Sequence, residues 1–590
     1  MRLGGKKTRA VKAGKIRRGQ MITTAGCGAV VDLPRNSVIM AGIDFWKDTD
    51  EDVFRIQEDN LQQYLGVDFF VLPPANVEDA PRRNHGVPAF RFPQWMYCPT
   101  CNRLASERTF NFDGNPKCNR CKEYLVPSRF VIACENGHLD DFPYEWWVHR
   151  NEPCEKPELY ILMSERSSGL ESIVIWCKTC RKSRSMMGSF AKNALSNMEP
   201  GCTGRRPWLN DIDPNSCEKT MRTLQRGASN LYFSITASAL SIPPWSRRIQ
   251  IVLGKNWRTL GVLVNDRSTF ETVVKALKIP EECNSTATEI WQEAVKKKQN
   301  QEAGVQKTWQ DILEEEYKAL SEGFTDDDGQ FKTRAAEVPV FMAGYIEQVT
   351  KVLRLREVVA LKGFKRITPD FDLQDPQTFT RLGSTFSNWL PGVELLGEGI
   401  FLTLSEERLI KWETRPEVIM RCSNLINRSE GSLFHKENLS PRYILMHSLA
   451  HLLIRQMIMQ CGYGAAAIKE RIYSTFVDED NPLTMSGILI YTADTDSEGS
   501  LGGLVREGNP ERLDNTFRHM LEEASWCSAD PICIQSGGQG VDALNLAACH
   551  ACTLLPETSC ESRNCFLDRG LIIGTPETPS LGYFSDLLNR

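Results

Sequence analysis

Cys98-Pro-Thr-Cys101, followed by Cys118-Asn-Arg-Cys121, decides how this part of the chain folds. A CxxC turn places two thiolates on one side of a tight loop, and two such arms complete a tetrahedral shell of four sulfurs around Zn²⁺. Sixteen residues separate Cys101 from Cys118, which is enough for a short hairpin, as in a zinc ribbon. Because a closed shell of four sulfurs leaves no open position for water, the pattern indicates a structural metal rather than a catalytic one.

Further cysteines predict more sites of this kind. A second shell is expected from Cys177-x2-Cys180 together with Cys202 and Cys217. A third shell, mixed from two cysteines and two histidines, could come from residues between these two sites, namely Cys134, His138, His149 and Cys154. The alternative is that both histidines hydrogen-bond locally while the two cysteines are simply buried.

In the C-terminal region six cysteines compete for four coordination positions: Cys527, Cys533, Cys549, Cys552, Cys560 and Cys565. Cys549 and Cys552 share a knuckle, and Cys560 follows closely behind it. We expect Cys527 to be the fourth ligand, with Cys533 as the next choice, and Cys565 is not assigned as a ligand.

The bulk composition is that of a globular protein with several domains. The chain has 590 residues, of which 41% are hydrophobic and 25% charged, and domains average roughly 150 residues. We expect a mixed α/β (α+β), multidomain fold with several structural, zinc-ribbon-like modules of four cysteines. The expected segments are a basic arm with a strand-rich entry (1–95), a zinc-binding region (96–225), a mixed α/β region with a charged helical insert near 285–330 (226–440), and a C-terminal domain with a cysteine cluster (441–590).

Positive charge is concentrated at the N-terminus, although the net charge of the chain is −5. No acidic residue precedes Asp32. A basic segment of this kind suits contacts with nucleic-acid phosphates, and a solvated terminus without a partner is the alternative. The candidate nucleic-acid-binding residues are Lys6, Lys7, Arg9, Lys12, Lys15, Arg17 and Arg18.

The sequence predicts a soluble, cytoplasmic protein. No apolar segment of the secretory type follows the basic start, and the nearest long apolar run, from Tyr443 to Cys461, is interrupted by His447, His451 and Arg455. Twenty cysteines in a reducing compartment are expected to be metal ligands or buried thiols rather than disulfides.

Patterns of apolar residues predict the remaining elements. Met21–Leu33 predicts two short strands around a structural turn at Gly26-Cys27-Gly28, and 230–265 predicts strands. A helical hairpin is expected over 285–322, an amphipathic helix over 345–361, and a turn and strand from Trp389. Residues 441–461 predict a buried helix, and 487–491 a buried strand.

The nucleotide-binding motifs are missing from the sequence. No GxxxxGK[ST] phosphate loop is present, so the chain is not expected to hydrolyse ATP by itself, and no GxGxxG follows a strand. His447 and His451 stand at i, i+4, which can clamp a metal, but the metalloprotease motif needs Glu where this chain has Ser448. The favoured interpretation is two histidines packed and hydrogen-bonded inside a buried helix.

Three carboxylates form the alternative catalytic hypothesis. Asp494, Asp496 and Glu498 precede the glycines Gly499, Gly502 and Gly503, and such a loop could hold Mg²⁺ or approach a phosphate. A metal-dependent nuclease or phosphohydrolase would use these residues and could add His447 and His451. Acidic residues in a glycine-rich turn are also ordinary loop chemistry.

Several motifs carry a resemblance to known families. The C-terminal run through Ala548-Cys-His-Ala-Cys552 and Pro556-Glu-Thr-Ser-Cys560 to Leu567-Asp-Arg569 resembles a zinc-binding domain of unknown function associated with superfamily 2 helicases. More narrowly, four segments resemble the DrmB family. They are Arg18-Gly-Gln-Met-Ile-Thr-Thr-Ala-Gly-Cys-Gly-Ala, Ala133-Cys-Glu-Asn-Gly-His-Leu-Asp-Asp-Phe-Pro, Glu394-Leu-Leu-Gly-Glu-Gly-Ile-Phe-Leu and Tyr491-Thr-Ala-Asp-Thr-Asp-Ser-Glu-Gly-Ser-Leu-Gly-Gly-Leu-Val.

This resemblance implies a partnership rather than an activity. DrmB proteins are non-helicase subunits of the bacterial DISARM anti-phage system, and they pair with the helicase DrmA in a complex that engages DNA. The resemblance therefore implies an accessory subunit in a heterocomplex, with Zn²⁺ as cofactor, DNA as partner, no membrane and no small-molecule substrate, and it supplies no catalytic residues. The alternative to a DNA-engaging subunit is a pure scaffold without a DNA surface of its own.

Overall fold

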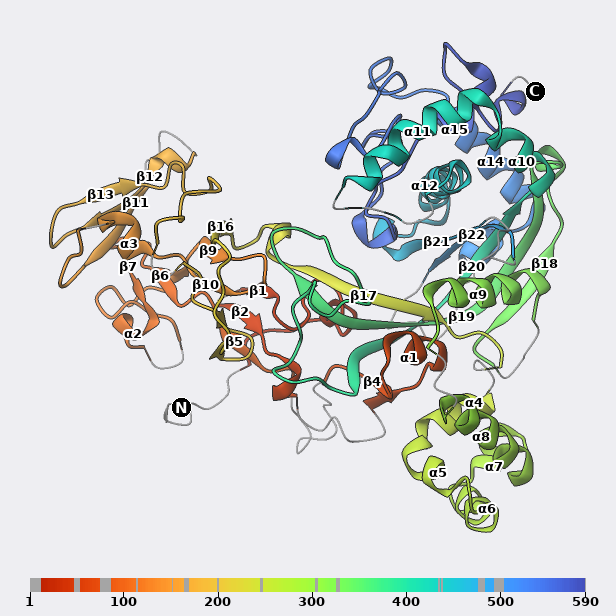
Figure 1. Ribbon diagram of the computed structural model, residues 1–590, viewed down its shortest axis with the longest axis horizontal. Helices are drawn as coiled ribbons and strands as arrows, with labels where there is room; N and C mark the ends of the chain where they lie inside the picture. The colour runs from red at the N-terminus through yellow and green to blue at the C-terminus, as the bar shows by residue number, and fades with distance from the viewer. Residues whose placement is uncertain are drawn as a thin grey trace. The chain divides into compact units, whose positions relative to one another are not determined.

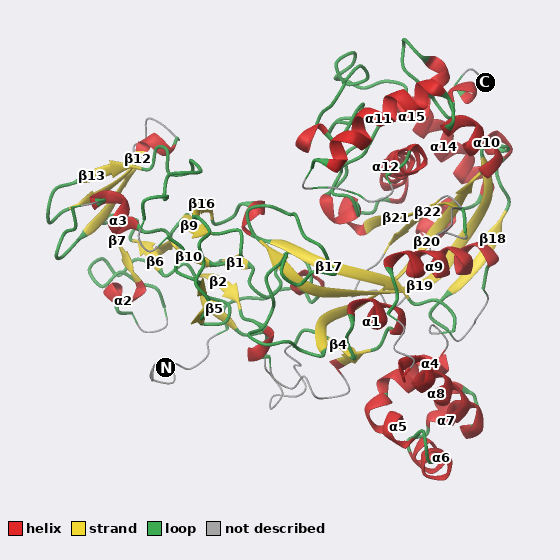
Figure 2. Ribbon diagram, viewed as in Figure 1, coloured by secondary structure: helices red, strands yellow, loops and turns green. Residues whose placement is uncertain are grey.

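The computed structural model describes residues 12–34, 36–46, 54–74, 86–112, 115–150, 152–163, 169–198, 201–244, 248–302, 306–324, 329–432, 434, 436, 439–475, 483–492 and 503–588. The chain divides into two compact units, and each is assembled from separated stretches of sequence. Unit 1 comprises Met1–Phe54, Val71–Ala237 and Ala360–Gly392; unit 2 comprises Arg55–Phe70, Ser238–Val359 and Val393–Arg590. Helices and sheets are mixed, as the expected fold class requires (Figures 1 and 2).

The zinc-binding region of unit 1 is built on a six-stranded antiparallel sheet of order β13-β12-β11-β7-β6-β8. Its strands are β6 (Trp95–Tyr97), β7 (Arg103–Ser106), β8 (Val126–Pro127), β11 (Leu159–Met163), β12 (Ile173–Cys177) and β13 (Ser183–Ser185). Two short helices accompany it, α2 (Glu107–Phe110) and α3 (Tyr144–His149). The core under α3 is aromatic, with Phe142, Tyr144 and Trp147 all buried.

Three smaller sheets also lie in the described part of unit 1. They are β1 (Val30–Leu33), β2 (Asn36–Met40) and β5 (Ala89–Arg91); β10 (Leu139–Asp141), β9 (Phe130–Ala133) and β16 (Arg222–Gln225); and β14 (Arg205–Arg206) with β15 (Asp211–Ile212).

The segment before β1 contains a short 3-10 helix and turns rather than the expected strand. Gly28 there has φ +83°, and a Cβ on it would lie 2.5 Å from the ring of Phe364, so the glycine serves a close-packed turn.

An eight-stranded sheet is the largest in the chain's described part. Its path runs β17 (Phe233–Leu240), β19 (Ile346–Lys365), β20 (Trp389–Leu404), β22 (Met485–Thr492) and β21 (Ile468–Thr475). Off this path, β18 (Lys332–Ala336) pairs with β19, β4 (Phe69–Val71) pairs with β20, and β3 (Arg55–Ile56) pairs with β4. α1 (Asp59–Leu65) lies between β3 and β4 in the sequence.

Helix α12 (Pro441–Cys461) lies inside a ring of other C-terminal elements of unit 2 (Figure 1). It begins where the Ser440 side chain accepts a hydrogen bond from the Tyr443 amide, with proline at the first helical position, and it ends at Gly462 in the left-handed region. The helix contacts β21 and β22 as well as neighbouring helices, so it is apolar on nearly all sides. The other helices of this part are α9 (Trp309–Glu322), α10 (Glu406–Glu413), α11 (Pro416–Glu430), α13 (Gly503–Glu507), α14 (Pro510–Ala524) and α15 (Gly570–Ile573).

Five helices form a small bundle of their own within the described residues (Figure 2). They are α4 (Arg248–Lys255), α5 (Trp257–Leu263), α6 (Arg267–Ala276), α7 (Ile279–Cys283) and α8 (Ala287–Glu302). Leu260, Phe270 and Ile290 are fully buried in its core. The expected hairpin over 285–322 is confirmed as helical, but α8 belongs to this bundle whereas α9 packs on β21 and β22.

Two further secondary-structure predictions are wrong. Residues 248–263, expected as strand, form α4 and α5, because the bundle buries one face of each helix. Residues 345–361, expected as helix, lie mainly in β19, whose C-terminal half is buried on both faces and so loses the alternation typical of a strand. The predictions of a helix over 441–461 and a strand over 487–491 are confirmed.

Candidate zinc centres

Three CxxC knuckles in unit 1 share one backbone geometry. In each, the residue after the second cysteine has positive φ and donates its amide to the carbonyl of the first cysteine: Asn102 to Cys98 at 2.8 Å, Lys122 to Cys118 at 2.9 Å and Arg181 to Cys177 at 2.9 Å. This tight turn directs both thiols of a knuckle to the same side. The β6–β7 hairpin carries the first knuckle, and β12–β13 carries the third.

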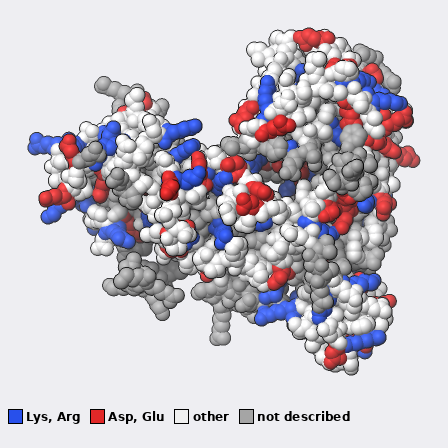
Figure 3. All heavy atoms as spheres, in the orientation of Figure 1, with Lys and Arg blue, Asp and Glu red and all other residues white. Residues whose placement is uncertain are grey.

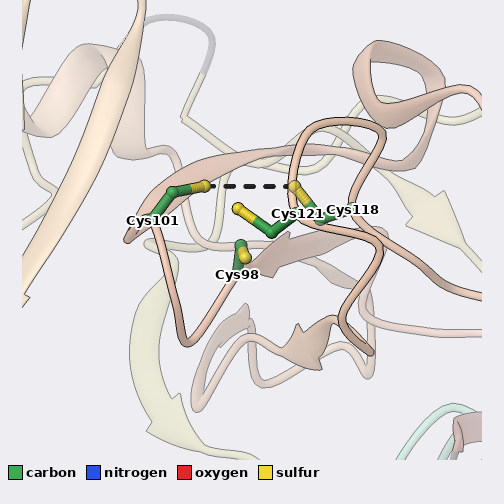
Figure 4. A group of neighbouring side chains, drawn as sticks. All are labelled: Cys98, Cys101, Cys118 and Cys121. Atoms are coloured by element: carbon green, nitrogen blue, oxygen red, sulfur yellow. Dashed lines mark hydrogen bonds between the residues drawn. The ribbon is translucent and has the colours of Figure 1, made fainter.

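The first two knuckles face each other and bring four sulfurs together, as Figure 4 shows. The Sγ atoms of Cys98, Cys101, Cys118 and Cys121 all lie within 4.8 Å of one another, and that of Cys101 lies 3.9 Å from that of Cys118. A tetrahedral Zn²⁺ with Zn–S bonds of about 2.3 Å has sulfurs about 3.8 Å apart. The arrangement therefore fits a zinc ion without rearrangement.

The other two sites of unit 1 combine residues differently from the prediction. Cys202 and Cys217 gather with Cys134 and His138, whereas Cys177 and Cys180 gather with His149 and Cys154. Each group thus has three cysteines and one histidine, instead of one set of four cysteines and one of two cysteines with two histidines. The reason is which elements pack together. Cys134 directly follows β9, and β9 pairs with β16, which begins a few residues after Cys217. His149 ends α3, and α3 packs on β12, whose last residue is Cys177.

Distances inside the group of Cys134, His138, Cys202 and Cys217 fit a tetrahedral metal. The Sγ of Cys134 lies 3.9 Å from that of Cys217 and 3.7 Å from that of Cys202. Nδ1 of His138 lies 3.5 Å from the Cys134 sulfur and 3.4 Å from the Cys202 sulfur. Zn–N bonds of about 2.0–2.1 Å with Zn–S of about 2.3 Å predict about 3.5 Å for such an N···S edge.

Each histidine of these groups is oriented by its second ring nitrogen. Nε2 of His138 lies 3.3 Å from Asp213, whose carboxylate also pairs with Arg206. Nδ1 of His149 lies 2.7 Å from the carbonyl oxygen of Glu145 and must donate to it, so Nε2 carries the lone pair. A histidine held by a carboxylate or carbonyl on its far nitrogen is the usual arrangement of a zinc ligand.

The C-terminal cluster consists of Cys527, Cys533, Cys549 and Cys552. Their sulfurs lie 3.6 Å (Cys527 to Cys549), 3.7 Å (Cys549 to Cys552) and 3.8 Å (Cys533 to Cys552) apart, again the edges of a tetrahedron of four sulfurs around zinc. Cys533, the next choice from sequence, occupies the place expected for Cys560. Asp530 holds the loop between Cys527 and Cys533 by accepting from the Cys527 amide and pairing with buried Arg569.

Cys560 belongs elsewhere, because the 3-10 turn at Glu557–Ser559 directs it toward β21 and α12. There it lies with His447, His451 and Glu470, and all four side chains are buried. The two histidines are packed inside the helix as expected, but sequence reasoning missed their carboxylate and thiol partners. The signals were the i, i+4 histidine pair and a surplus of C-terminal cysteines.

The environment of two thiols favours the thiolate that binds a metal. Hydrogen bonding to Cys134, reinforced by His138, lowers the pKa of Cys202 to about 4. Burial raises the pKa of Cys177, but the Cys180 amide and His149 more than offset this and lower it to about 6. The same hydrogen bond to Cys202 raises the pKa of Cys134, so the thiolate, which is the ligand form of cysteine, is favoured at one member of that pair.

The remaining sequence candidates are only partly covered by the structure. Lys12, Lys15 and Arg17 are exposed, and Arg18 is half-buried. Lys6, Lys7 and Arg9 lie outside the described residues, as do the carboxylates Asp494, Asp496 and Glu498. Among the helices that are described, none has the length and apolar character needed to cross a bilayer.

Cysteine and histidine tetrads on knuckles, with spacings that match Zn²⁺, define a multi-site zinc protein. The family comparison agrees, because residues 449–553 match the MrfA Zn-binding domain; residues 17–233 match a domain of unknown function (DUF8724). The chain is 32% identical over 598 residues to the DISARM protein DrmB of Bacillus paralicheniformis, covering 95% of this chain and 100% of that protein. The chain belongs to the DrmB family.

Proposed function

We propose that this chain is the accessory subunit of a bacterial anti-phage defence complex, in which it pairs with a superfamily 2 helicase and engages DNA. The observation that carries the proposal is the identity to a DISARM protein along essentially the whole length of both chains. The similarity is not confined to one domain, so a part in DISARM defence is proposed for the chain as a whole.

The missing phosphate loop supports the proposal that a partner protein supplies the ATP-hydrolysing motor. No GxxxxGK[ST] motif occurs in the sequence, so ATP hydrolysis comes from the helicase, and this chain contributes surfaces. The four tetrads with three or four sulfurs are closed shells and act as structural centres. Their ligands are Cys98, Cys101, Cys118 and Cys121; Cys134, His138, Cys202 and Cys217; His149, Cys154, Cys177 and Cys180; and Cys527, Cys533, Cys549 and Cys552.

DNA contact is assigned to local basic features rather than to a broad basic face. Figure 3 shows Lys and Arg interspersed with Asp and Glu over the described surface of the face it presents. Exposed basic residues do occur at the third knuckle (Lys178 and Arg181), in the strand β13 that follows it (Arg184), and on the N-terminal segment. Such residues position a complex on phosphates without selecting a sequence.

The test is DNA binding by the purified, zinc-loaded chain across a salt series, with single- and double-stranded probes. Affinity should fall steeply as salt rises, because each neutralised phosphate contributes about −0.9 to the slope for a duplex. The triple variant Lys12→Ala, Lys15→Ala, Arg17→Ala should make that slope shallower by roughly 2–3. A matched control removes three exposed lysines from helices α4, α6 and α9: Lys255→Ala, Lys275→Ala, Lys318→Ala.

Two results would count against the proposal. Equal losses of affinity in the two triple variants would show that the N-terminal segment has no special part in DNA contact. If neither the folded chain nor its complex with a DrmA-type helicase bound DNA, the subunit would be a scaffold. Co-purification of the two proteins tests the pairing separately from the DNA contact.

A further inference from the structure

Four buried polar side chains meet where α12 packs on β21. α12 contributes His447 and His451 at i, i+4, β21 contributes Glu470, and the loop after Glu557–Ser559 contributes Cys560. Their exposed fractions are 0%, 0%, 1% and 6% respectively. Polar groups this deeply buried are stable only when they are paired, hydrogen-bonded or bound to a metal.

The ring of His451 is oriented toward the other three side chains. Its Nδ1 lies 3.0 Å from the carbonyl oxygen of Thr553 and donates to it, so Nε2 carries the lone pair. That Nε2 lies 3.3 Å from Oε1 of Glu470 but makes no hydrogen bond. This is the orientation of a metal-binding imidazole, with a carbonyl fixing the far nitrogen.

His447 and Cys560 close the group from the other side. Nε2 of His447 lies 2.9 Å from Oε1 of Glu470 and 3.1 Å from Sγ of Cys560. A tetrahedral Zn²⁺ predicts about 3.4 Å for the N···O edge and about 3.5 Å for the N···S edge. The side chains are therefore slightly closer together than around a bound ion, and a small outward shift would seat one.

Among the described residues, the ion-pair partners of the Glu470 carboxylate are the two histidines, whose Nε2 atoms both lie near Oε1. Neither carboxylate oxygen has the geometry of a well-formed hydrogen bond, although both are buried. The neighbouring Arg471 pairs instead with Glu316, Glu357 and Glu561. A divalent cation bound by a carboxylate, a thiolate and two neutral imidazoles would leave the site with no net charge.

We propose that His447, His451, Glu470 and Cys560 form a fifth zinc site, separate from the Cys527–Cys552 cluster. Two imidazoles, one thiolate and one carboxylate are a borderline donor set that suits Zn²⁺ better than the hard cations Mg²⁺ or Ca²⁺. All four positions are filled by protein, so the ion would be structural. It would join α12 and the strand that follows it, β21, to the C-terminal loop, which lies far from both in the sequence.

The test is the zinc content of the full-length chain, with crystals of the same protein measured at the zinc absorption edge. Five ions per chain are expected, one for each tetrad in the described residues, including an anomalous peak between His447 and Cys560. His451→Gln should lower the count by one ion. The control His519→Gln alters an exposed histidine of α14 and should leave the count unchanged.

The crystal measurement keeps the proposal testable if His451→Gln fails to fold, because it uses the unaltered chain. Anomalous peaks at the four cysteine-rich tetrads with none beside Glu470 would overturn the proposal and leave a hydrogen-bonded cluster. A peak there that keeps its height in data collected just below the zinc edge would come from a lighter metal such as iron, and would also overturn the assignment of Zn²⁺.

Discussion

The backbone carbonyl of Thr553 accepts a hydrogen bond from Nδ1 of His451 at 3.0 Å. The hydroxyl of the same threonine donates to the sulfur of Cys552 at 3.2 Å. One residue therefore contacts both the C-terminal cysteine cluster and the buried histidine group, and it fixes a ligand in each. The two candidate metal sites of unit 2 are joined through this single side chain and its backbone.

Replacing Thr553 by valine should weaken the Cys552 site while keeping the shape of the side chain. The variant loses a hydrogen bond to a thiolate, and loss of such a contact outside the ligand shell typically costs about 10–100-fold in metal affinity. Zinc transfer to a chelating dye should be faster for Thr553→Val, whereas Thr553→Ser, which retains the hydroxyl, should resemble the unaltered chain. Identical rates for all three would show that the hydroxyl has no part in holding the metal.

Pairs of cysteine substitutions should reveal how the ligands of unit 1 are grouped. Because Cys134 and Cys202 lie in one tetrad, Cys134→Ser with Cys202→Ser should remove one zinc per chain. Cys177→Ser with Cys202→Ser affects two tetrads and should remove two. Native mass spectrometry counts the ions, and the reverse result would restore the grouping expected from sequence.

Arg471 should be essential for the stability of unit 2. It pairs with Glu316 at 2.7 Å, both side chains are fully buried, and Tyr473 also donates to Glu316. Arg471→Met leaves the buried carboxylate of Glu316 without its ion-pair partner and should lower the free energy of unfolding by about 3–5 kcal/mol. Urea denaturation measures this, with Lys411→Met, which breaks an exposed i, i+4 pair with Glu407, as a control that should change stability by under about 0.5 kcal/mol.

Restoring charge balance should rescue Arg471→Met in part. The double variant Arg471→Met, Glu316→Gln removes the stranded charge and should be more stable than Arg471→Met alone. If the double variant were no more stable, the loss would arise from packing of the arginine rather than from the unpaired carboxylate.

Glu58 should make unit 2 less stable as the pH rises. Burial raises the pKa of Glu58 to about 7 despite Arg356 at 3.0 Å, whereas the unfolded value is 4.5. A group whose pKa is raised by folding stabilises the fold below its unfolded pKa, and this contribution is lost as the pH rises toward the folded pKa. The loss is on the order of 3 kcal/mol between pH 4.5 and about 7.

The variant Glu58→Gln tests this pH dependence. Glutamine does not ionise, so the variant lacks this pH-dependent loss of stability. From about pH 5 to about pH 7, the free energy of unfolding in urea should therefore change in favour of Glu58→Gln relative to the unaltered chain. In this range the folded and unfolded forms of the unaltered chain bind different numbers of protons. A difference that stays constant over this range would show that Glu58 ionises normally in the fold.

The cysteine knuckles could be predicted from sequence because each is set by four adjacent residues. Their partners could not, since Cys217 reaches Cys134 only through the pairing of β16 with β9. Likewise His447 and His451 are visible as a pair on one helix face, but Glu470 lies in a strand that spacing alone does not bring to them. Spacing in the sequence predicts the ligands that lie on one turn or helix, and the pairing of distant strands decides which other ligands join them.

The error over 345–361 has a similar origin. Apolar residues at Val349, Val352 and Leu355 repeat every three residues, which is typical of a helix. In β19 the charged Arg356 and Glu357 are buried as well, because each has an ion-pair partner on another element. Because these ion pairs allow charged residues to be buried on both faces of β19, the strand lacks the alternation of apolar and polar residues by which a strand is recognised in a sequence.

The chain passes between the two units at residues 54/55, 70/71, 237/238, 359/360 and 392/393. During synthesis, the tetrads up to Cys217 therefore leave the ribosome well before residues 360–392, which complete unit 1. Early zinc capture would protect these thiols while the nascent unit still lacks its last segment. In addition, no single cut of the polypeptide releases either unit intact. A truncated chain would therefore lack some of the segments from which a unit is assembled.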